Sequence, residues 1–170
     1  MTDAGNGANI DILIQEAARN ARLPIDIVRP VVIQESTGNP FATRFEPAFY
    51  ERYLKGKPVT FVPNGCSRET ERIGRAMSWG LMQIMGETAR FKGFRGWFGE
   101  LLLPETGLFW GCRYLAGLRD KYFAQGGWPG VLRAYNGGPG NWDNPGNHYP
   151  DAVLSHIPGG AWPTTEVSHG

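Results

Sequence analysis

The segment 104–123, PETGLFWGCRYLAGLRDKYF, is the longest part of the sequence that has the spacing of a single helix. Pro104 suits the first helical position, where the missing backbone N–H costs nothing. Gly126 and Gly127 follow as a stop signal. Apolar residues recur three or four positions apart, at Leu108, Phe109, Cys112, Leu115, Leu118 and Tyr122. The segment therefore predicts the longest helix of the fold.

Outward from this segment, further helices are expected on both sides. Their residue ranges are 10–22, 25–36, 45–55, 68–77, 81–91, 129–135 and 151–157. The connecting ranges 56–67, 93–99 and 136–146 are rich in glycine and proline, and the first of them could form a small hairpin. Because convincing strands are scarce, the sequence predicts a mainly α domain with at most a small β-hairpin.

Length and composition narrow the class of protein. A chain of 170 residues fits a single domain, 1–170, with a core of about residues 10–157. Its net charge of +1 argues against nucleic acid as a partner. No 18-residue apolar run predicts membrane insertion, and the N-terminal residues lack the pattern of a secretion signal. We expect a monomer that is made in the cytoplasm without a signal peptide.

Cysteine and histidine give no sign of a metal site. Cys66 and Cys112 are 46 residues apart and lie outside any CxxC motif, so two free thiols are expected. The three histidines lie near the C-terminus and share no ligand spacing with the cysteines. We predict neither a metal ion nor an organic cofactor.

The dipeptide Glu35-Ser36 ends the second expected helix and is the first candidate for chemistry. At helical spacing, Glu35 shares a face with Val28, Val31 and Val32. Burial and the negative end of the helix dipole would both raise the pKa of this carboxyl group. A raised pKa suits a general acid working near neutral pH. The alternative is a last helical turn that simply reaches solvent.

Two later segments add polar groups that suit sugar recognition. In 78–85, SWGLMQIM, Gly80 permits close backbone approach and Gln83 supplies a donor and an acceptor. In 134–140, AYNGGPG, Tyr135 and Asn136 stand where a helix gives way to a glycine loop. Each segment alone could be structural, since methionines often fill cores and glycine runs often form turns.

Glu-Ser, Gly-Leu-Met-Gln and Ala-Tyr-Asn-x-Gly, in that order, resemble the catalytic domain of the soluble lytic transglycosylases, in the goose-type lysozyme superfamily. The resemblance extends from about residue 25 to 157. It implies a lysozyme-like helical fold with a substrate cleft and Glu35 as the catalytic acid and base. It also implies that Gln83 and Met85 line the cleft and that Tyr135 hydrogen-bonds the catalytic carboxylate. The substrate-binding residues expected on this basis are Ser36, Ser78, Gln83, Met85, Tyr135, Asn136 and Tyr149.

The implied activity is cleavage of the β-1,4 bond between N-acetylmuramic acid and N-acetylglucosamine in peptidoglycan, with formation of a 1,6-anhydro ring. The glycan strand would be the partner, and the cell wall the place of action. A phage or prophage lysin, an endolysin or virion component, is the expected setting. The sequence departs from the family pattern in a long spacing of about 40 residues before Gly80, and at Gly74 and Gly86, where serine and proline are usual.

Two alternatives remain open from the residues alone. The insertion 37–77 carries several carboxylates, and Glu46 is the candidate for a second one in the site. If Glu46 enters the cleft, a hydrolytic muramidase becomes credible, because many glycosidases use two carboxylates. If it only pairs with Arg44 on the surface, it needs no function. The other alternative is a non-catalytic glycan-binding module, against which the retained Glu35 argues.

Overall fold

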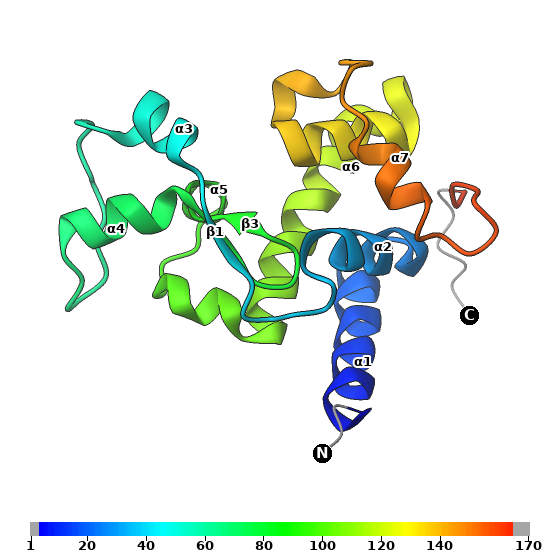
Figure 1. Cartoon of the computed structure of the whole chain (residues 1–170), viewed down its shortest axis with the longest axis horizontal. Helices are drawn as coiled ribbons and strands as arrows, with labels where there is room; N and C mark the ends of the chain where they lie inside the picture. Colours follow the sequence, from blue (N-terminus) through cyan, green and yellow to red (C-terminus); the bar gives the residue numbers. More distant parts are fainter. Residues whose placement is uncertain (1–3, 165–170) are drawn as a thin grey trace.

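The computed structural model describes residues 4–164, and helices dominate this part of the chain (Figure 1). The α-helices are α1 (Ala4–Asn20), α2 (Ile25–Ser36), α3 (Pro47–Phe49), α4 (Arg68–Arg75), α5 (Gly86–Phe91), α6 (Pro104–Gly137) and α7 (Tyr149–Leu154). Shorter helices are the π-helix η1 (Tyr50–Leu54) and the 3₁₀-helices η2 (Phe98–Leu102) and η3 (Pro139–Asn141). The strands are β1 (Thr43–Phe45), β2 (Met77–Trp79) and β3 (Ile84–Met85). The mainly α prediction is confirmed, and none of these helices could cross a lipid bilayer.

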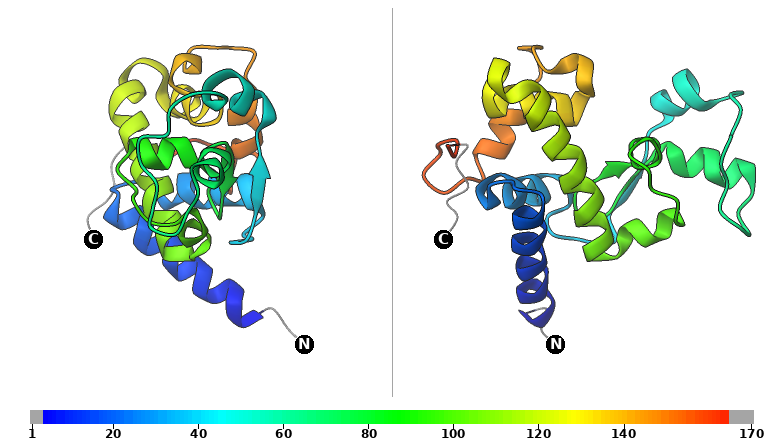
Figure 2. Two further views of the ribbon diagram at one scale, coloured as in Figure 1. Left: turned by 90° about the vertical axis from the view of Figure 1, so that its left-hand side faces the viewer. Right: turned by 180° about the vertical axis from the view of Figure 1, so that it is seen from behind.

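Helix α6 runs through the middle of the molecule, and the other parts pack on its two sides (Figures 1 and 2). Its backbone leaves helical geometry at Gly127, with φ 56° and ψ −162°. Such a positive φ is open to glycine at little cost. The break lies where the sequence predicts one helix to end and a second, 129–135, to begin. It turns the last part of α6 toward the cleft described below.

Two apolar clusters flank α6. The larger joins α1, α2, α6 and α7, which we call the helical lobe, and its fully buried members include Val28, Leu115 and Leu132. The smaller lies in residues 43–102, which we call the sheet lobe, and consists of Ile84, Ala89, Phe94, Phe98 and Leu101. The two clusters are separate, so the molecule has two lobes, and α6 belongs to the helical lobe while its Trp110 and Tyr114 also pack against the smaller cluster.

The three strands form one antiparallel sheet in the order β1-β2-β3. The hairpin therefore joins β2 and β3, and of the two alternatives for 56–67, a loop or a small hairpin, the structure shows the loop. The predicted helix 81–91 is also wrong at its start, since α5 begins only at Gly86. The cause is a chain reversal at Gly80 and Gln83, which have φ values of 69° and 46°. A side chain on Gly80 would overlap the carbonyl oxygen of Leu101.

A buried carboxylate joins α4 to α5. Glu71 has no exposed surface, and Arg90 binds its two oxygens at 2.8 and 2.9 Å, while Arg75 Nε adds a third bond of 2.9 Å. The Arg90 guanidinium also lies 4.1 Å from the centre of the Phe98 ring. Burial alone would raise the pKa of Glu71, but the two arginines outweigh it and lower that pKa. The ion pair therefore connects the helices and the apolar cluster of the sheet lobe.

Gly74 and Gly86, where the resemblance leads us to expect serine and proline, are neighbours in space. A Cβ on Gly86 would overlap the carbonyl oxygen of Gly74, and a Cβ on Gly74 would overlap the Phe98 ring. The same Gly74 carbonyl accepts a bond of 3.0 Å from Trp79 Nε1. In this chain the two glycines allow α4 and α5 to approach closely, with Phe98 filling the space beside them.

Both cysteines are free thiols in the structure, which confirms the prediction from the sequence. Cys112 belongs to the core of the helical lobe, and burial raises the pKa of its thiol to about 12. Its Sγ lies 3.7 Å from Met82 Sδ. A thiol in this environment stays protonated at neutral pH and packs as a small apolar side chain.

Replacing Gly86 with alanine is expected to destabilise the protein by about 1–3 kcal/mol, because the added methyl group has no room between α4 and α5. Urea unfolding measures this effect. The matched control is Gly99→Ala, since a Cβ there meets nothing within 4 Å. Equal stability of the Gly86→Ala and Gly99→Ala proteins would contradict the close approach of the two helices.

Replacing Glu71 with alanine is expected to cost about 3–5 kcal/mol, because it leaves two arginines without their buried partner. The control is Glu51→Ala, which removes an exposed partner of Lys55 and should leave stability nearly unchanged. The lowered pKa of Glu71 also predicts that its contribution is present at neutral pH and is lost as the pH falls through that pKa. Thermal melts of both variants from pH 7 down to pH 3 measure the two effects.

Candidate active site

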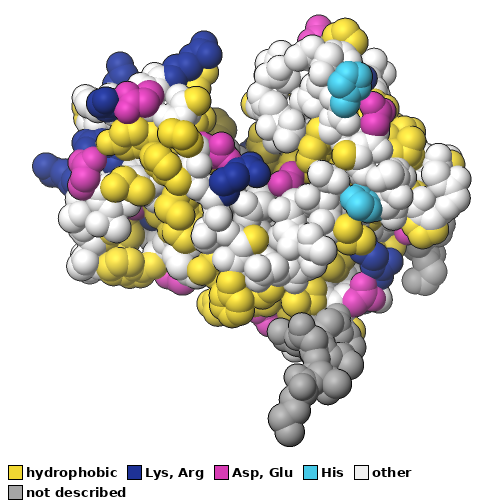
Figure 3. Space-filling view, viewed as in Figure 1, with side chains coloured by type: hydrophobic (Ala, Val, Ile, Leu, Met, Phe, Trp, Pro, Cys, Tyr) yellow, Lys and Arg dark blue, Asp and Glu magenta, His cyan; other side chains and the backbone are white. Residues whose placement is uncertain are grey.

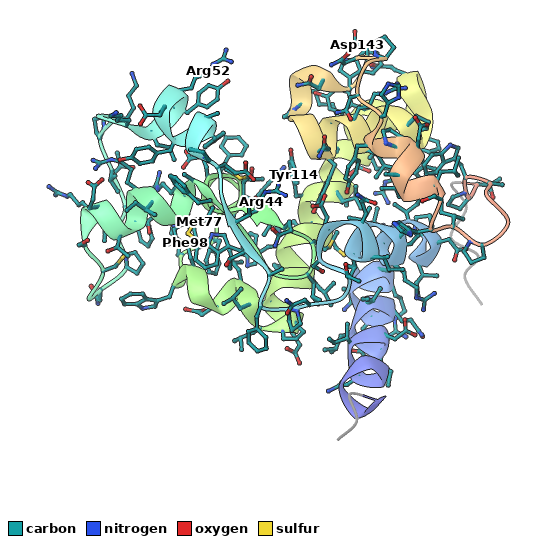
Figure 4. All side chains as sticks on the ribbon, viewed as in Figure 1. Arg44, Arg52, Met77, Phe98, Tyr114 and Asp143 are labelled. Atoms are coloured by element: carbon teal, nitrogen blue, oxygen red, sulfur yellow. The ribbon has the colours of Figure 1, made fainter. Side chains whose placement is uncertain are left out.

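A cleft of about 600 Å³ lies between the sheet lobe and the end of α6. The hollow opens between the two halves of the molecule in Figure 3, and Figure 4 labels Arg44 and Tyr114 beside it. Its walls come from β1 to β3, from the α3–η1 segment, and from the glycine loop after α6. The lining residues are Glu35, Arg44, Glu46, Phe49, Tyr53, Ser78, Gln83, Ile84, Met85, Thr88, Tyr114, Tyr135 and 136–141.

Glu35 reaches the cleft from the last turn of α2. The buried face of this helix holds Val28, Val31 and Val32, as the sequence predicts, so packing fixes the carboxyl group in direction. Its Oε1 accepts a hydrogen bond of 2.6 Å from the hydroxyl of Tyr149. The side chain is half-buried, and burial is the largest effect on its pKa, which is raised. The alternative of a last helical turn that simply reaches solvent does not hold.

Three further groups change the pKa of Glu35. The Tyr149 hydroxyl and the Arg44 guanidinium both favour the ionised form, whereas Glu46 disfavours it by repulsion. Burial outweighs the two favourable groups, so the net change of the pKa is upward. A carboxyl group in this position can hold a proton closer to neutral pH than a solvated glutamic acid does.

The sheet places a row of side chains along the cleft. Arg44 pairs with Ser78 across β1 and β2, and Ser78 pairs with Met85 across β2 and β3. Directly paired residues point to the same face of a sheet, so all three line the cleft. Glu46 also lines it, and its Oε1 lies 2.5 Å from Arg44 Nε and 3.5 Å from Ser78 Oγ. The insertion thus brings both a cation and a second carboxylate into the cleft.

Gln83 lines the cleft as expected, but its amide nitrogen is already in use. Nε2 donates to the carbonyl oxygens of Ala42 and Gly80, at 2.8 and 2.9 Å. These bonds fasten the β2–β3 turn to the segment before β1. The amide oxygen is the part of Gln83 that remains for a ligand, and it can only accept a hydrogen bond.

The two tyrosines exchange the expected roles. Tyr135 lines the cleft, but its hydroxyl donates to the carbonyl oxygen of Met82 at 2.6 Å, so the predicted bond from Tyr135 to the Glu35 carboxylate is wrong. Tyr149 makes that bond instead, from outside the set of lining residues. Burial and the nearby Glu35 charge raise the pKa of Tyr149, which keeps its phenol protonated and able to donate. Tyr149 therefore holds the carboxyl group of Glu35 from outside the set of lining residues.

Ser36 was expected at the substrate and is not among the lining residues. Its hydroxyl lies 2.8 Å from the carbonyl oxygen of Leu81 and 3.1 Å from that of Val32, and it donates to them. The position of Ser36 therefore explains the Glu-Ser dipeptide structurally: the serine fastens the end of α2 to the turn that carries Gln83. Ser78, Met85 and Asn136 do line the cleft, as predicted.

Asn147 connects two site residues and was missed from the sequence. Its amide nitrogen lies 3.3 Å from Asn136 Oδ1, and its Oδ1 accepts from the backbone N–H of Tyr149 at 3.0 Å. The only signal was its position two residues before Tyr149 in a loop rich in asparagine and glycine. Phe49, Tyr53 and Asn141 line the cleft and were also missed. In the part of the chain that the structure describes, no three His, Cys, Asp or Glu side chains gather to hold a metal ion.

Comparison with protein families agrees with this geometry. The model of the transglycosylase SLT domain matches residues 12–152, which include Glu35, the whole insertion and the loop between η3 and α7. The chain belongs to this family. As an SLT domain it is a lysozyme-like lytic transglycosylase that cleaves the glycan strands of peptidoglycan, and the non-catalytic alternative is set aside. No curated protein and no solved structure matches the chain.

Replacing Tyr149 with phenylalanine removes one hydrogen bond from Glu35 and leaves the ring in place. Because that bond favours the ionised form, its loss raises the pKa of Glu35 further. If the acid form is the active one, the alkaline limb of the kcat/KM profile moves to higher pH. We also expect kcat to fall about tenfold, as for loss of a bond to a charged group.

The matched control for this experiment is Tyr122→Phe, which removes a phenol hydroxyl outside the cleft and keeps the ring stacked on Trp142. Its pH profile should coincide with that of the unmodified SLT domain. An alkaline limb that stays in place in the Tyr149→Phe protein would contradict the role of this hydrogen bond in setting the pKa of Glu35.

Proposed function

We propose that Glu35 performs both proton transfers of a non-hydrolytic cleavage, in one catalytic domain that includes both lobes. The observation that carries the proposal is the raised pKa of a carboxyl group that is half-buried in the cleft and held by Tyr149. A group with these properties can be protonated when substrate binds and can still accept a proton afterwards.

In the first step, the protonated Glu35 gives its proton to the oxygen that bridges N-acetylmuramic acid and N-acetylglucosamine. The bond from C1 of the muramic acid to this oxygen breaks, and the glucosamine leaves with a new hydroxyl group. Positive charge develops on the muramyl ring, as in other glycoside cleavages. The ionised Glu35 is then stabilised by the Tyr149 hydroxyl and by Arg44.

In the second step, the C6 hydroxyl of the same muramic acid attacks C1, and Glu35 takes the proton that this hydroxyl loses. The product is a 1,6-anhydro ring, no water is consumed, and Glu35 returns to its acid form. Gln83 Oε1, Ser78, Met85, Asn136 and Tyr135 are proposed to hold the sugar rings, since all of them line the cleft.

Hydrolysis of the same bond is the second candidate, and one observation favours it. Glu46 lines the same cleft as Glu35, so a second carboxylate is available to activate water. Its Oε1 is paired with Arg44 Nε at 2.5 Å, so one of its two oxygens is already occupied. We therefore rank the transglycosylase reaction first. A bacteriolytic role and a phage origin stay predictions, and turbidity loss of cell-wall suspensions tests the first of them.

Replacing Glu35 with glutamine is expected to lower kcat at least about a thousandfold, because it removes the acid and base and keeps the shape. Mass spectrometry of digested peptidoglycan should detect 1,6-anhydro-muramyl ends with the unmodified protein. The Glu46→Gln protein is the control, and it should give the same ends at a similar rate. Activity that survives Glu35→Gln would refute the assigned role. Reducing ends alone, lost in Glu46→Gln, would establish the hydrolytic candidate instead.

A further inference from the structure

The α3–η1 segment forms one wall of the cleft and belongs to the insertion that separates the first two sequence motifs. It stands above Arg44 in Figure 4, where Arg52 marks its outer end. The segment is fixed at its base, because the Glu46 N–H donates to the Ala76 carbonyl oxygen at 2.9 Å. Leu54 is buried, and the Tyr50 hydroxyl donates to Glu69 at 3.2 Å. These contacts give the wall a defined position over the cleft.

Two aromatic side chains of this wall, Phe49 and Tyr53, line the cleft. They are four residues apart, where α3 passes into the π-helix η1, and their ring centres are 4.9 Å apart at an angle of 49°. Tyr53 is 50% exposed, and Phe49 is half-buried. Neither ring is needed to fasten the segment, since Leu54 and Tyr50 do so. Single turns of π-helix are frequent at functional sites.

The opposite wall has a different chemistry. It consists of Asn136, Asn141 and the glycine loop between them, which offer amide and backbone hydrogen-bonding groups. A sugar ring in a β-1,4-linked glycan is amphipathic: its faces carry C–H groups and its edges carry hydroxyl and N-acetyl groups. An aromatic wall facing a polar wall matches both parts of such a ring.

We infer that Phe49 and Tyr53 form a sugar-stacking platform, which binds a ring of the glycan strand beside the one that reacts. The inference rests on the proposed function, because it takes the glycan to lie in the cleft with Glu35. Arg52 Cζ lies 5.1 Å from the centre of the Tyr53 ring. A cation over this aromatic ring limits its free surface, so the sugar binds the part of the ring that lines the cleft together with Phe49. The insertion thereby adds a binding subsite to the cleft.

The test uses the full chain with Glu35→Gln, so that binding is measured without cleavage. N-acetylglucosamine oligomers of two to six residues are titrated by calorimetry. Affinity should increase at the length that reaches the platform, and Phe49→Ala or Tyr53→Ala should remove this increase. The expected loss for the longest oligomer is about tenfold, which corresponds to about 1.4 kcal/mol. Tyr53→Phe keeps the ring and should bind like its parent.

The control variant is Phe91→Ala, which removes an 84% exposed aromatic ring on α5 outside the cleft and should leave affinity unchanged. Phe49→Leu keeps apolar volume for folding but lacks a flat ring, and it should also lose the length-dependent increase. In the active chain, KM should rise about tenfold for these variants while kcat changes less than twofold. A length-dependent increase that persists in Phe49→Ala, Phe49→Leu and Tyr53→Ala proteins, each with an unchanged melting temperature, overturns the platform.

Failure of the proposed function gives a different result. If Glu35→Gln proteins still cleave peptidoglycan, the assigned acid is wrong, and the titrations still report whether the platform binds sugar. If Glu35→Gln abolishes cleavage and the platform variants bind all oligomers like their parent, only the platform is wrong. The two outcomes are read from separate measurements on the same set of proteins.

Discussion

The buried carboxylate of Glu71 is the interaction on which the sheet lobe depends. It accepts three bonds from Arg75 and Arg90, and it thereby joins α4, α5 and the cluster around Phe98. This lobe has a small apolar core, so a charged network supplies connections that its few apolar side chains cannot. Since the same lobe carries the row of Arg44, Ser78 and Met85, the shape of one cleft wall follows from an ion pair outside the cleft.

The longer helices could be predicted because α2 and α6 have a long apolar stripe and Gly127 gives a clear break. The sheet could not, because its strands are two or three residues long and β1 pairs with β2 across more than 30 residues of chain. The helix predicted over 81–91 failed for a related reason. The apolar spacing there is real, but the positive φ values of Gly80 and Gln83 reverse the chain.

In the site, the motifs predicted which residues line the cleft better than they predicted the hydrogen bonds of those residues. Glu35, Gln83 and Met85 line the cleft as expected. Helix α2 places Glu35, and the β2–β3 hairpin places Gln83 and Met85. The roles of Tyr135 and Ser36 depended on hydrogen bonds to backbone carbonyls of Met82 and Leu81, which no side-chain pattern reveals. The aromatic wall was invisible for a third reason: it lies in the insertion, where the family pattern offers no guide.

The contact between Gly74 and Gly86 has a consequence for how this enzyme can vary. A serine at the first position and a proline at the second both need volume that the present spacing of α4 and α5 does not provide. A variant of this chain with those residues would have to hold the two helices farther apart, and Phe98 would then have to move or shrink. Positions 74, 86 and 98 therefore have to change together. Introducing serine at 74 and proline at 86 would also require a different side chain at 98.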